Sequence, residues 1–260
     1  MIGYFRTIWH LRHFWMALVR SDLRSRYRRS MIGIGWSLLH PIAMTAILCT
    51  VFGSLFQAEV RTFGPFVISG LVTWYFIVAA AMQGAQCFFQ GESYIRQVPA
   101  PLAIYPLRTV LGAGFHLVLG LLVAIVLAGC MNGIRHPAAL LGILPVLPLL
   151  FILGWAVALL CGTMNVLFQD AQHLLEVGLQ IAFYCAPIMY PPKMLRGRGL
   201  GWVIDYNPVT PFLEIIRQPI VEGHVAPLSV FAMAALYTSL AAAGAALLLA
   251  KFERKVIFYL

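Results

Sequence analysis

The side chains that could carry out metal or acid–base chemistry are few, and they are scattered along the chain. The closest grouping is Asp170, His173 and Glu176, whose i, i+3, i+6 spacing keeps successive side chains adjacent on a helix. Carboxylates and imidazole can bind a metal ion, but a solvated turn with Asp170 near a helix N-terminus accounts for the same residues. We favour the turn and predict neither a metal site nor a catalytic group.

Binding of a nucleotide through a phosphate loop of the form GxxxxGK[ST] requires a lysine directly after a glycine. The chain has three lysines, Lys193, Lys251 and Lys255, and none of them follows a glycine. The sequence contains neither the metalloprotease pattern HExxH nor the nucleophile pattern GxSxG. We therefore expect a chain that is not an enzyme and has no cofactor of its own.

The elements that must position the functional residues follow from the composition. Of the 260 residues, 61% are apolar or aromatic and 10% are charged, whereas a soluble domain averages about 45–50% apolar and about 25% charged residues. A bilayer-spanning helix uses about 20 apolar residues. Six stretches are long enough, at 33–56, 66–89, 104–130, 138–165, 173–190 and 228–250. The predicted fold class is an all-α polytopic membrane protein with six transmembrane helices.

The charges predict how the chain is oriented in the membrane. Seven arginines fall within the first 29 residues, and the cytoplasmic flanks of membrane proteins are enriched in Lys and Arg. Six crossings return the C-terminus to the same side, where Lys251, Arg254 and Lys255 make the last segment basic. We expect both termini in the cytoplasm. The five cysteines are far apart, form no CxxC pair and are predicted to be packing residues.

An apolar stripe precedes the first predicted span. Tyr4, Ile8, Leu11, Trp15 and Leu18 recur at steps of 4, 3, 4 and 3, which is the spacing of one helical face, and basic residues lie off the stripe. This pattern is typical of an amphipathic helix that lies in the membrane interface. The alternative is a cytoplasmic helix that packs on protein.

The connection between the fifth and sixth predicted spans is unusual. Residues 191–227 are too long for a tight turn and too mixed in character to cross the bilayer. The sequence Asn207-Pro208 biases the backbone away from helix. After it we predict a short helix with Thr210 as its N-cap, Pro211 as its first residue and Gly223 as its stop. The segment is therefore predicted to be a broken re-entrant helical hairpin.

Such a hairpin is tolerated at membrane depth only where protein or a water-filled cavity surrounds it, which indicates a gate at the outer face. Arg217 is expected to pair with Asp205 or Glu214 to hold the gate closed. The alternative is a hairpin that only caps the fold. The predicted outer-gate residues are Trp202, Tyr206, Asn207, Pro208 and Arg217.

Residues 20–41 resemble the signature of one transporter group. The stretch reads Arg20-Ser-Asp22-Leu-Arg24-Ser-Arg26-Tyr27, then Ser30-Met-Ile-Gly33-Ile-Gly35-Trp36, and then Pro41. The type-2 ABC exporter permeases, which move polysaccharides such as O-antigen, capsule and teichoic acid, carry a basic R-D-[LI]-[KR]-x-R-Y segment, S-x-L-G-x-x-W and a proline. In this chain Ser21 adds one position between Arg20 and Asp22.

Four later segments resemble the same family, in the family's order. Residues 94–101 resemble the cytoplasmic connection that docks on the ATPase. Residues 165–170 resemble N-x-x-x-R-D after span four, with Gln169 in place of the usual arginine. Residues 186–191 resemble the [SA]-P-[IV]-[ILMV]-Y-P end of span five, and residues 207–217 resemble the N-P…R of the outer gate helices.

The resemblance implies a single transmembrane permease domain over residues 1–260. Its parts are an interfacial helix and basic collar (1–30), spans one to five (31–190), the outer gate hairpin (191–227), and span six with a cytoplasmic tail (228–260). Such permeases form homodimers that bind two copies of a nucleotide-binding ATPase subunit, which holds ATP and Mg. The family exports lipid-linked, O-antigen-like polysaccharide across the bacterial inner membrane, as in lipopolysaccharide biosynthesis. No nucleic acid partner is implied.

Two alternatives remain open at this stage. The first is a type-2 ABC permease that exports a small hydrophobic molecule or a lipid, since its membrane portion would look alike. The second is a membrane-embedded acyl or glycosyl transferase, which requires acidic or histidine pairs at a membrane face. Only the group at Asp170, His173 and Glu176 comes close to that requirement.

The resemblance implies roles for three further sets of residues: contacts to phosphate, aromatic rings of a channel, and a docking surface for the ATPase. Arginines of the collar are expected to pair with the phosphate of a lipid carrier, or else only to orient the chain and touch anionic lipid. Aromatic rings are expected to stack on sugars in a channel, or else to form an interface belt or pack between helices. Independently of the resemblance, His116 lies within span three, where ionisable residues are usually functional, and it either lines a path or packs as a neutral residue between helices. The predicted sets are Arg20, Arg24, Arg26, Arg28 and Arg29 for phosphate; Trp36, Trp74, Tyr75, Phe76 and Tyr184 for the channel; and Ser93, Tyr94, Arg96 and Pro99 for docking of the ATPase.

Overall fold

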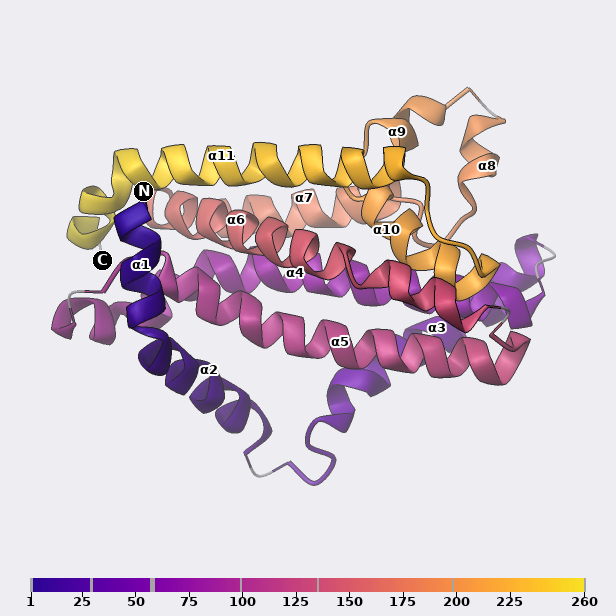
Figure 1. Ribbon diagram of the computed structural model, residues 1–260, viewed down its shortest axis with the longest axis horizontal. Coiled ribbons are helices and arrows are strands. Elements are labelled where there is room, and N and C mark those ends of the chain that lie inside the picture. Colours follow the sequence, from indigo (N-terminus) through magenta and orange to yellow (C-terminus); the bar gives the residue numbers. More distant parts are fainter. Residues whose placement is uncertain are drawn as a thin grey trace.

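The computed structural model describes residues 2–28, 30–56, 59–98, 100–134, 136–197 and 199–259, and every regular element in these ranges is helical. Figure 1 shows the arrangement. In chain order the elements are α1 (Ile2–His10), α2 (Arg12–Tyr27), α3 (Gly35–Phe56), α4 (Val60–Gln97), α5 (Ile104–Asn132), η1 (Pro137–Ile143), α6 (Val146–Leu167), α7 (Ala171–Cys185), α8 (Pro192–Arg196), α9 (Gly201–Asp205), α10 (Thr210–Arg217), η2 (Gln218–Glu222) and α11 (Leu228–Tyr259).

Five helical stretches among the described residues are long and apolar enough to cross a membrane, and they confirm a multi-pass helical membrane protein. They are Gly35–Gly53, Val60–Gln97, Ile104–Asn132, Pro137–Leu167 and Leu228–Glu253.

The stretch predicted as a span at 173–190 forms only the 15-residue helix α7. It ends at Cys185 because Ala186 takes an extended conformation with ψ 140°, as expected for a residue that precedes a proline.

The long helices lie beside one another, and the two ends of the chain lie at the same end of the bundle (Figure 1). We call this the terminal end; it contains α1, the last turns of α4 and the end of α11. The helices α8 and α9 lie at the opposite end. The central helix is α4, since 67% of its span is buried, compared with 22% for α3 and for α11.

Small residues let α4 approach α6 closely. A Cβ atom on Gly84 of α4 would lie 2.5 Å from the Cα of Ala158, and one on Gly162 of α6 would lie 2.7 Å from the carbonyl oxygen of Gly84. No side chain fits at either position, so the two backbones are in direct contact. Contacts of this kind are how helices associate in membranes, where hydrophobic burial between helices contributes little.

The last two turns of α4 extend beyond the predicted span. The residues that resemble the docking connection begin at Tyr94, but the helix continues to Gln97 and ends where the N–H of Val98 bonds to the carbonyl of Tyr94. The residues that resemble the ATPase-docking connection therefore lie largely on a rigid helix that projects at the terminal end.

The predicted apolar stripe of the N-terminal segment packs on protein. It is divided between α1 and α2, which meet at Leu11. Ile8 is buried against Ala103 and Ile104 at the start of α5, and Tyr4, Leu11 and Trp15 pack partly buried on the same cluster. Leu18 is buried as well. These contacts favour the second interpretation of the stripe, a helix that packs on protein.

An ion pair ties α2 to the bundle. The Nε of Arg108, on α5, lies 2.6 Å from a carboxylate oxygen of Asp22 on α2. The Arg108 side chain is 12% exposed, so it cannot exchange this partner freely for water. The pair fixes α2 against α5 and thereby places the collar beside α4 and α5.

The segment between α7 and α11 is built of short helices, as predicted, but its N-cap prediction is wrong. Thr210 is the first residue of α10, and the side-chain oxygen of Asn207 instead accepts the N–H of Val209 at 2.9 Å. The stop at Gly223 is confirmed, because this residue follows Glu222 with φ 78°, a conformation that favours glycine.

Two of the five cysteines, Cys49 and Cys87, are buried in hydrophobic clusters, and all five are free thiols. Cys49 and Cys87 pack as small apolar side chains, as the sequence predicted, whereas Cys130 is exposed.

We expect Gly84→Ala to reduce the free energy of unfolding by about 1–3 kcal/mol, because the added methyl group would force α4 and α6 apart. Thermal unfolding of the detergent-solubilised protein measures the change. Gly114→Ala on α5 is the matched control, since no atom lies within 4 Å of its Cβ position. Equal unfolding temperatures for the two variants would contradict the direct contact of α4 with α6.

Candidate functional site

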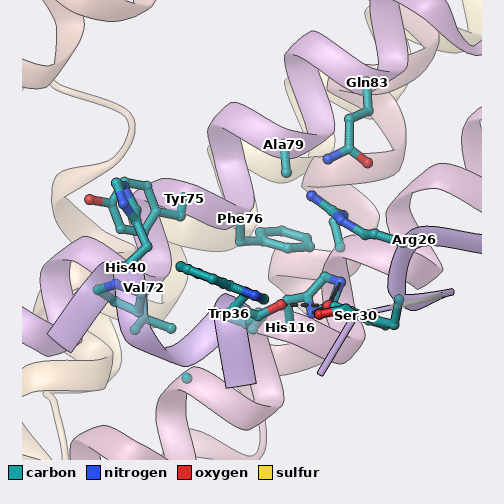
Figure 2. A pocket seen from close by; sticks show the side chains of 16 residues that line it. Arg26, Ser30, Trp36, His40, Val72, Tyr75, Phe76, Ala79, Gln83 and His116 are labelled. Atoms are coloured by element: carbon teal, nitrogen blue, oxygen red, sulfur yellow. Dashed lines mark hydrogen bonds between the residues drawn. The ribbon is translucent and has the colours of Figure 1, made fainter. Parts of the chain in front are cut away.

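A cavity of about 470 Å³ lies between the end of α2, the start of α3 and the middle of α4 and α5. Helices α3, α4 and α5 each contain a stretch able to span the membrane, so the cavity lies within the part of the bundle that such helices form. Sixteen residues line it (Figure 2). They combine aromatic, cationic and uncharged polar side chains, which is unusual at this depth, where polar groups are costly and generally functional.

Three of the five predicted channel aromatics line this cavity: Trp36, Tyr75 and Phe76. Figure 2 shows Trp36 and Phe76 near the middle of the view, with His40 beside Tyr75. The ring centroids of His40 and Tyr75 are 5.1 Å apart. Trp36 is 55% exposed, so its face is free to meet a ligand.

The other two predicted channel aromatics lie elsewhere. Trp74 is only 4% exposed and packs against Phe183, with 5.8 Å between ring centroids. Tyr184 lies on α7 and is 59% exposed. On a helix, neighbours such as Trp74 and Tyr75 point in different directions, which is why adjacent aromatics of α4 have different surroundings.

Close packing behind the cavity holds its aromatic wall in place. A Cβ on Gly154 of α6 would lie 2.7 Å from the ring of Phe76, and one on Gly120 of α5 would lie 2.6 Å from a methyl carbon of Val72. The two glycines leave room for the side chains of α4. Phe76 is 3% exposed and Val72 is 4% exposed, so this wall is rigid.

A glycine turn places Trp36 at the cavity. The turn between α2 and α3 contains Gly33 with φ 56°, a conformation that a Cβ atom disfavours. The side-chain oxygen of Ser30 accepts the N–H of Gly33 at 3.0 Å. Local structure therefore explains three positions of the family-like signature. Ser30 and Gly33 build the turn, and the turn positions the side chain of Trp36.

Polar side chains join the end of α2 to α3 and α5 at the cavity. The hydroxyl of Tyr27 shares a hydrogen bond with the hydroxyl of Ser37, and it lies 3.2 Å from Nε2 of His116. The Tyr27 and His116 rings meet edge to face at 5.9 Å. His116 therefore lines the cavity, one of the two roles left open for it by the sequence.

A smaller polar cavity of about 200 Å³ shares Arg26 and Gln83 with the first one. It contains the ion pair of Asp22 and Arg108. Together the two cavities form a path of polar side chains from the collar to His116. Arg108 was not among the residues predicted from the sequence, although an arginine inside a predicted span is itself a signal of function.

The predicted phosphate contacts are divided by the structure. Arg26 lines both cavities, whereas Arg20, Arg24 and Arg28 are exposed residues of the collar that line neither of them. Arg29 lies outside the described residues.

The predicted ATPase-docking residues lie at the terminal end. Ser93, Tyr94 and Arg96 are exposed on the last turns of α4, and Arg96 forms an ion pair of 2.8 Å with Glu92 one turn earlier. Pro99 lies outside the described residues. An exposed, helical set of this kind offers a surface of fixed shape.

The predicted gate residues divide into an exposed and a buried set. Trp202 is 62% exposed and Tyr206 is 78% exposed. Pro208 is exposed, while the side chain of Asn207 caps the turn before α10.

Arg217 is buried and holds three segments together. Its guanidinium donates hydrogen bonds to the carbonyl oxygens of Phe66, at 3.2 Å, of Pro187, at 2.5 Å, and of Ile188, at 2.9 Å. It also lies over the ring of Phe66, 3.8 Å from the centroid. The five N–H donors of the planar guanidinium suit this arrangement. Gly70 makes room for the side chain, since a Cβ there would collide with it.

The predicted pairing of Arg217 with Asp205 or Glu214 is therefore wrong. Asp205 pairs with Arg196 at 2.7 Å, and the three carbonyls bind the guanidinium of Arg217. Burial lowers the pKa of Arg217 and raises the pKa of the Glu214 carboxyl, an effect that the charges of Arg196 and Arg217 oppose. Sequence spacing suggested charge partners, whereas the fold brings three backbone carbonyls within reach of the guanidinium.

Asp170 lies in the turn before α7, and His173 and Glu176 lie on the first turns of that helix; all three side chains are exposed. His173 and Glu176 approach to 3.9 Å with side chains 80% and 50% exposed, and among the described residues no three metal-ligating side chains gather.

Comparison with known proteins places the chain among transporters. The sequence model of the ABC-2 type transporter family matches residues 13–221. The chain is similar to the O-antigen export system permease protein RfbA of Klebsiella pneumoniae (24% identity over 209 residues, 80% of each chain) and of Myxococcus xanthus (25% over 211 residues, 80% of each). It is also similar to the polysialic acid transport protein KpsM of Escherichia coli (22% over 239 residues, 86% of this chain and 90% of the relative).

We expect Arg217→Lys to lower the free energy of unfolding by about 1–3 kcal/mol, because an ammonium group cannot reach all three carbonyls and leaves a buried acceptor without a partner. Arg196→Ala is the matched control at the same end of the molecule. Its ion pair with Asp205 is half exposed and is worth less than about 1 kcal/mol. Thermal unfolding that ranks Arg196→Ala as the more damaging change would refute this role of Arg217.

Proposed function

The chain belongs to the ABC-2 type transporter family, and on this premise we propose that it is the membrane-spanning subunit of an ABC exporter for a lipid-linked polysaccharide. Permeases that export O-antigen and polysialic acid are among its relatives. The lining of the cavity supports the same substrate class for this chain.

The observation that carries the proposal is the combination of side chains in the cavity. The rings of Trp36 and Tyr75 suit the C–H faces of sugars, whereas Phe76 is buried and forms part of the cavity wall. Arg26 suits a phosphate because guanidinium binds phosphate oxygens in a bidentate manner. Tyr27, at the same site, can exchange hydrogen bonds with hydroxyl groups. A permease for a small hydrophobic molecule, the second candidate, would have no need of this polar set.

The chain crosses the membrane six times in this proposal, with both termini in the cytoplasm. The position of the two ends at one end of the bundle (Figure 1) supports an even number of crossings. The helix α7, together with the residues up to 190, would form the remaining crossing, which is the fifth in chain order. The membrane is the inner membrane of a bacterial cell, and the terminal end faces the cytoplasm, where the basic collar and the basic tail are favoured.

Energy for export comes from a separate ATPase subunit that binds at the terminal end. The exposed set of Ser93, Tyr94 and Arg96 is the proposed docking surface, since it lies on the rigid end of α4. Movement of the ATPase would then be transmitted along α4, the helix that carries Tyr75 and Phe76. ATP and Mg would be held by that partner, whose phosphate loop this sequence does not contain.

Two copies of the chain form the permease in this proposal. None of the residues described on α7 is buried, and Leu174, Val177 and Ile181 are each at least 58% exposed. Such an apolar face is compatible with a second copy in the membrane. A homodimer would bring two cavities to one path and engage two ATPase subunits.

The segment from α8 to α10 is the proposed re-entrant outer gate. Arg217 anchors its second part to α4 and to the residues after α7. The movable part is accordingly α8 and α9, where Trp202 and Tyr206 are exposed and Arg196 pairs with Asp205 at the surface.

We expect the purified chain to hydrolyse no ATP, and its complex with the partner ATPase to do so at a typical enzymatic turnover, on the order of 1 per second or more. Co-purification with the ATPase, followed by phosphate release from the chain alone and from the complex, measures this. ATP hydrolysis by the chain alone at that rate would exclude the proposal.

We expect Arg26→Gln to lower export of the lipid-linked polysaccharide by roughly 10-fold to 100-fold, because a charge-assisted hydrogen bond to phosphate is worth about 1.5–3 kcal/mol. Arg20→Gln is the matched control, since it removes the same charge from the same helix but from outside the cavity. Export from inverted membrane vesicles, with topology checked by labelling, measures both variants. Equal export by the two variants would show that the collar acts only through its charge.

A further inference from the structure

Arg108 is a largely buried cation that has no part in the function proposed above. It lies near the start of α5, inside a stretch able to span the membrane, and its side chain is 12% exposed. In the described part of the chain it makes one hydrogen bond, from its Nε to Asp22 of α2 at 2.6 Å. The N–H groups of its two terminal nitrogens are therefore available to a ligand. A charge at this depth is costly and is generally functional.

The guanidinium of Arg108 shares the smaller polar cavity with that of Arg26. This cavity, of about 200 Å³, lies between α2, α4 and α5, and its charged lining residues are Asp22, Arg26 and Arg108. Two cations and one carboxylate leave it with an excess of positive charge. Gln83 and Gln90 of α4 add amide groups that can donate hydrogen bonds. An anion with several acceptor oxygens, such as a phosphate ester, fits this set of donors.

The smaller cavity continues into the larger one. Arg26 and Gln83 line both of them, and Figure 2 shows the polar ends of these two side chains pointing toward each other. Along α5, Arg108 lies about two turns before His116, with Gly112 between them on the same face. No atom lies within 4 Å of the Cβ position of Gly112, so the space beside it is open. A ligand with its sugar in the larger cavity can therefore place a phosphate in the smaller one.

Asp22 neutralises Arg108 in this structure, and it is the partner that can be released more easily. Its side chain is 43% exposed, whereas that of Arg108 is 12% exposed. Water can solvate the carboxylate when the pair opens, but a buried guanidinium without an anion is strongly unfavourable. The pair is therefore stable until another anion takes the place of the carboxylate. An uncharged ligand cannot make this exchange.

We propose that Arg108 is a second phosphate-binding residue of the exporter, and that Asp22 is its internal counterion, which the phosphate of the transported molecule displaces. This role of Arg108 rests on the proposed function, which places a phosphate at Arg26. Repulsion between the carboxylate and a phosphate in one small cavity favours the departure of Asp22. Its departure also loosens α2 from α5, because this ion pair joins the two helices. The exchange selects ligands that carry a phosphate over neutral ones.

The first test measures binding of glucose 1-phosphate to the full chain in detergent, by ligand-observed NMR. Methyl glucoside, which has the sugar ring but no phosphate, is the reference ligand. Arg108→Gln is expected to weaken binding of glucose 1-phosphate by roughly 10-fold to 100-fold, because hydrogen bonds between charged groups are lost. Its binding of methyl glucoside is expected to stay unchanged. Equal binding of glucose 1-phosphate by the wild type and Arg108→Gln would overturn the proposal.

The second test asks whether Asp22 competes with the ligand, and it does not depend on the folding of Arg108→Gln. Asp22→Asn keeps the shape of the side chain and an oxygen that accepts the N–H of Arg108. Removal of the competing charge is expected to tighten binding of glucose 1-phosphate several-fold. Glu92→Gln is the matched control, since Glu92 is 41% exposed and also pairs with an arginine but lines neither cavity. Unchanged or weaker binding by Asp22→Asn would refute the displacement.

The double variant Asp22→Asn/Arg108→Gln shows whether Asp22 acts through Arg108. If it does, Asp22→Asn is expected to give no gain in affinity once Arg108 has been replaced. The same several-fold gain in both backgrounds would show that the carboxylate repels the ligand without competing for Arg108, and it would refute the counterion role.

Arg26→Gln separates this proposal from the proposed function. Weaker binding of glucose 1-phosphate by Arg26→Gln, together with wild-type binding by Arg108→Gln, would refute the role of Arg108 alone. Wild-type binding by both variants would also remove the phosphate site on which the proposed function depends. Absence of binding by the wild type and Asp22→Asn alike would count against both.

Discussion

The direct contact of α4 with α6 is the constraint on which the rest of the structure depends. At Gly84 and Gly162 the two helices meet backbone to backbone, and in a membrane such packing replaces the hydrophobic driving force that is missing between helices. This contact makes α4 the central helix, packed also on α3 and α5. The same helix carries Tyr75 and Phe76 at the cavity and Ser93 and Arg96 at the terminal end. A rigid α4 thus connects the proposed substrate cavity with the proposed docking surface.

The two ends of the bundle are held together by different means. At the end opposite the termini, a buried cation joins three segments: the guanidinium of Arg217 donates to the carbonyls of Phe66, Pro187 and Ile188. A carbonyl buried away from water is costly without such a donor. At the terminal end, α1 and α2 are attached through side chains, with Tyr4 bonded to Glu253 and Asp22 paired with Arg108. The first arrangement is buried and rigid, whereas the second lies partly exposed at the surface.

The cavities of the bundle differ in chemistry, and the difference follows from the residues that face them. The cavity beside α3 combines Trp36, Arg26 and His116, and it suits a ligand with both sugar rings and a phosphate. A further cavity, between α1, α6 and α11, is lined by alanines of α11 and by Trp155 and is polar only at Tyr4 and Glu253, so it suits hydrocarbon. In the proposed exporter the first cavity would handle the transported molecule.

The sequence by itself determined the class of the protein, its spans except the shortest, and the family, because apolar length and local motifs are properties of continuous segments. It also identified Trp36, Tyr75, Phe76, Arg26 and His116 as candidate residues. Only the tertiary structure decided that these side chains meet in one cavity, that Trp74 is buried against Phe183, and that Arg217 binds carbonyls instead of Asp205 or Glu214. The physical reason is that the partners of a side chain depend on which residues the fold brings together. Residues 66, 187 and 217 are far apart along the chain. The carbonyls that bind Arg217, like the gap beside the alanines of α11, come together only once the helices have packed.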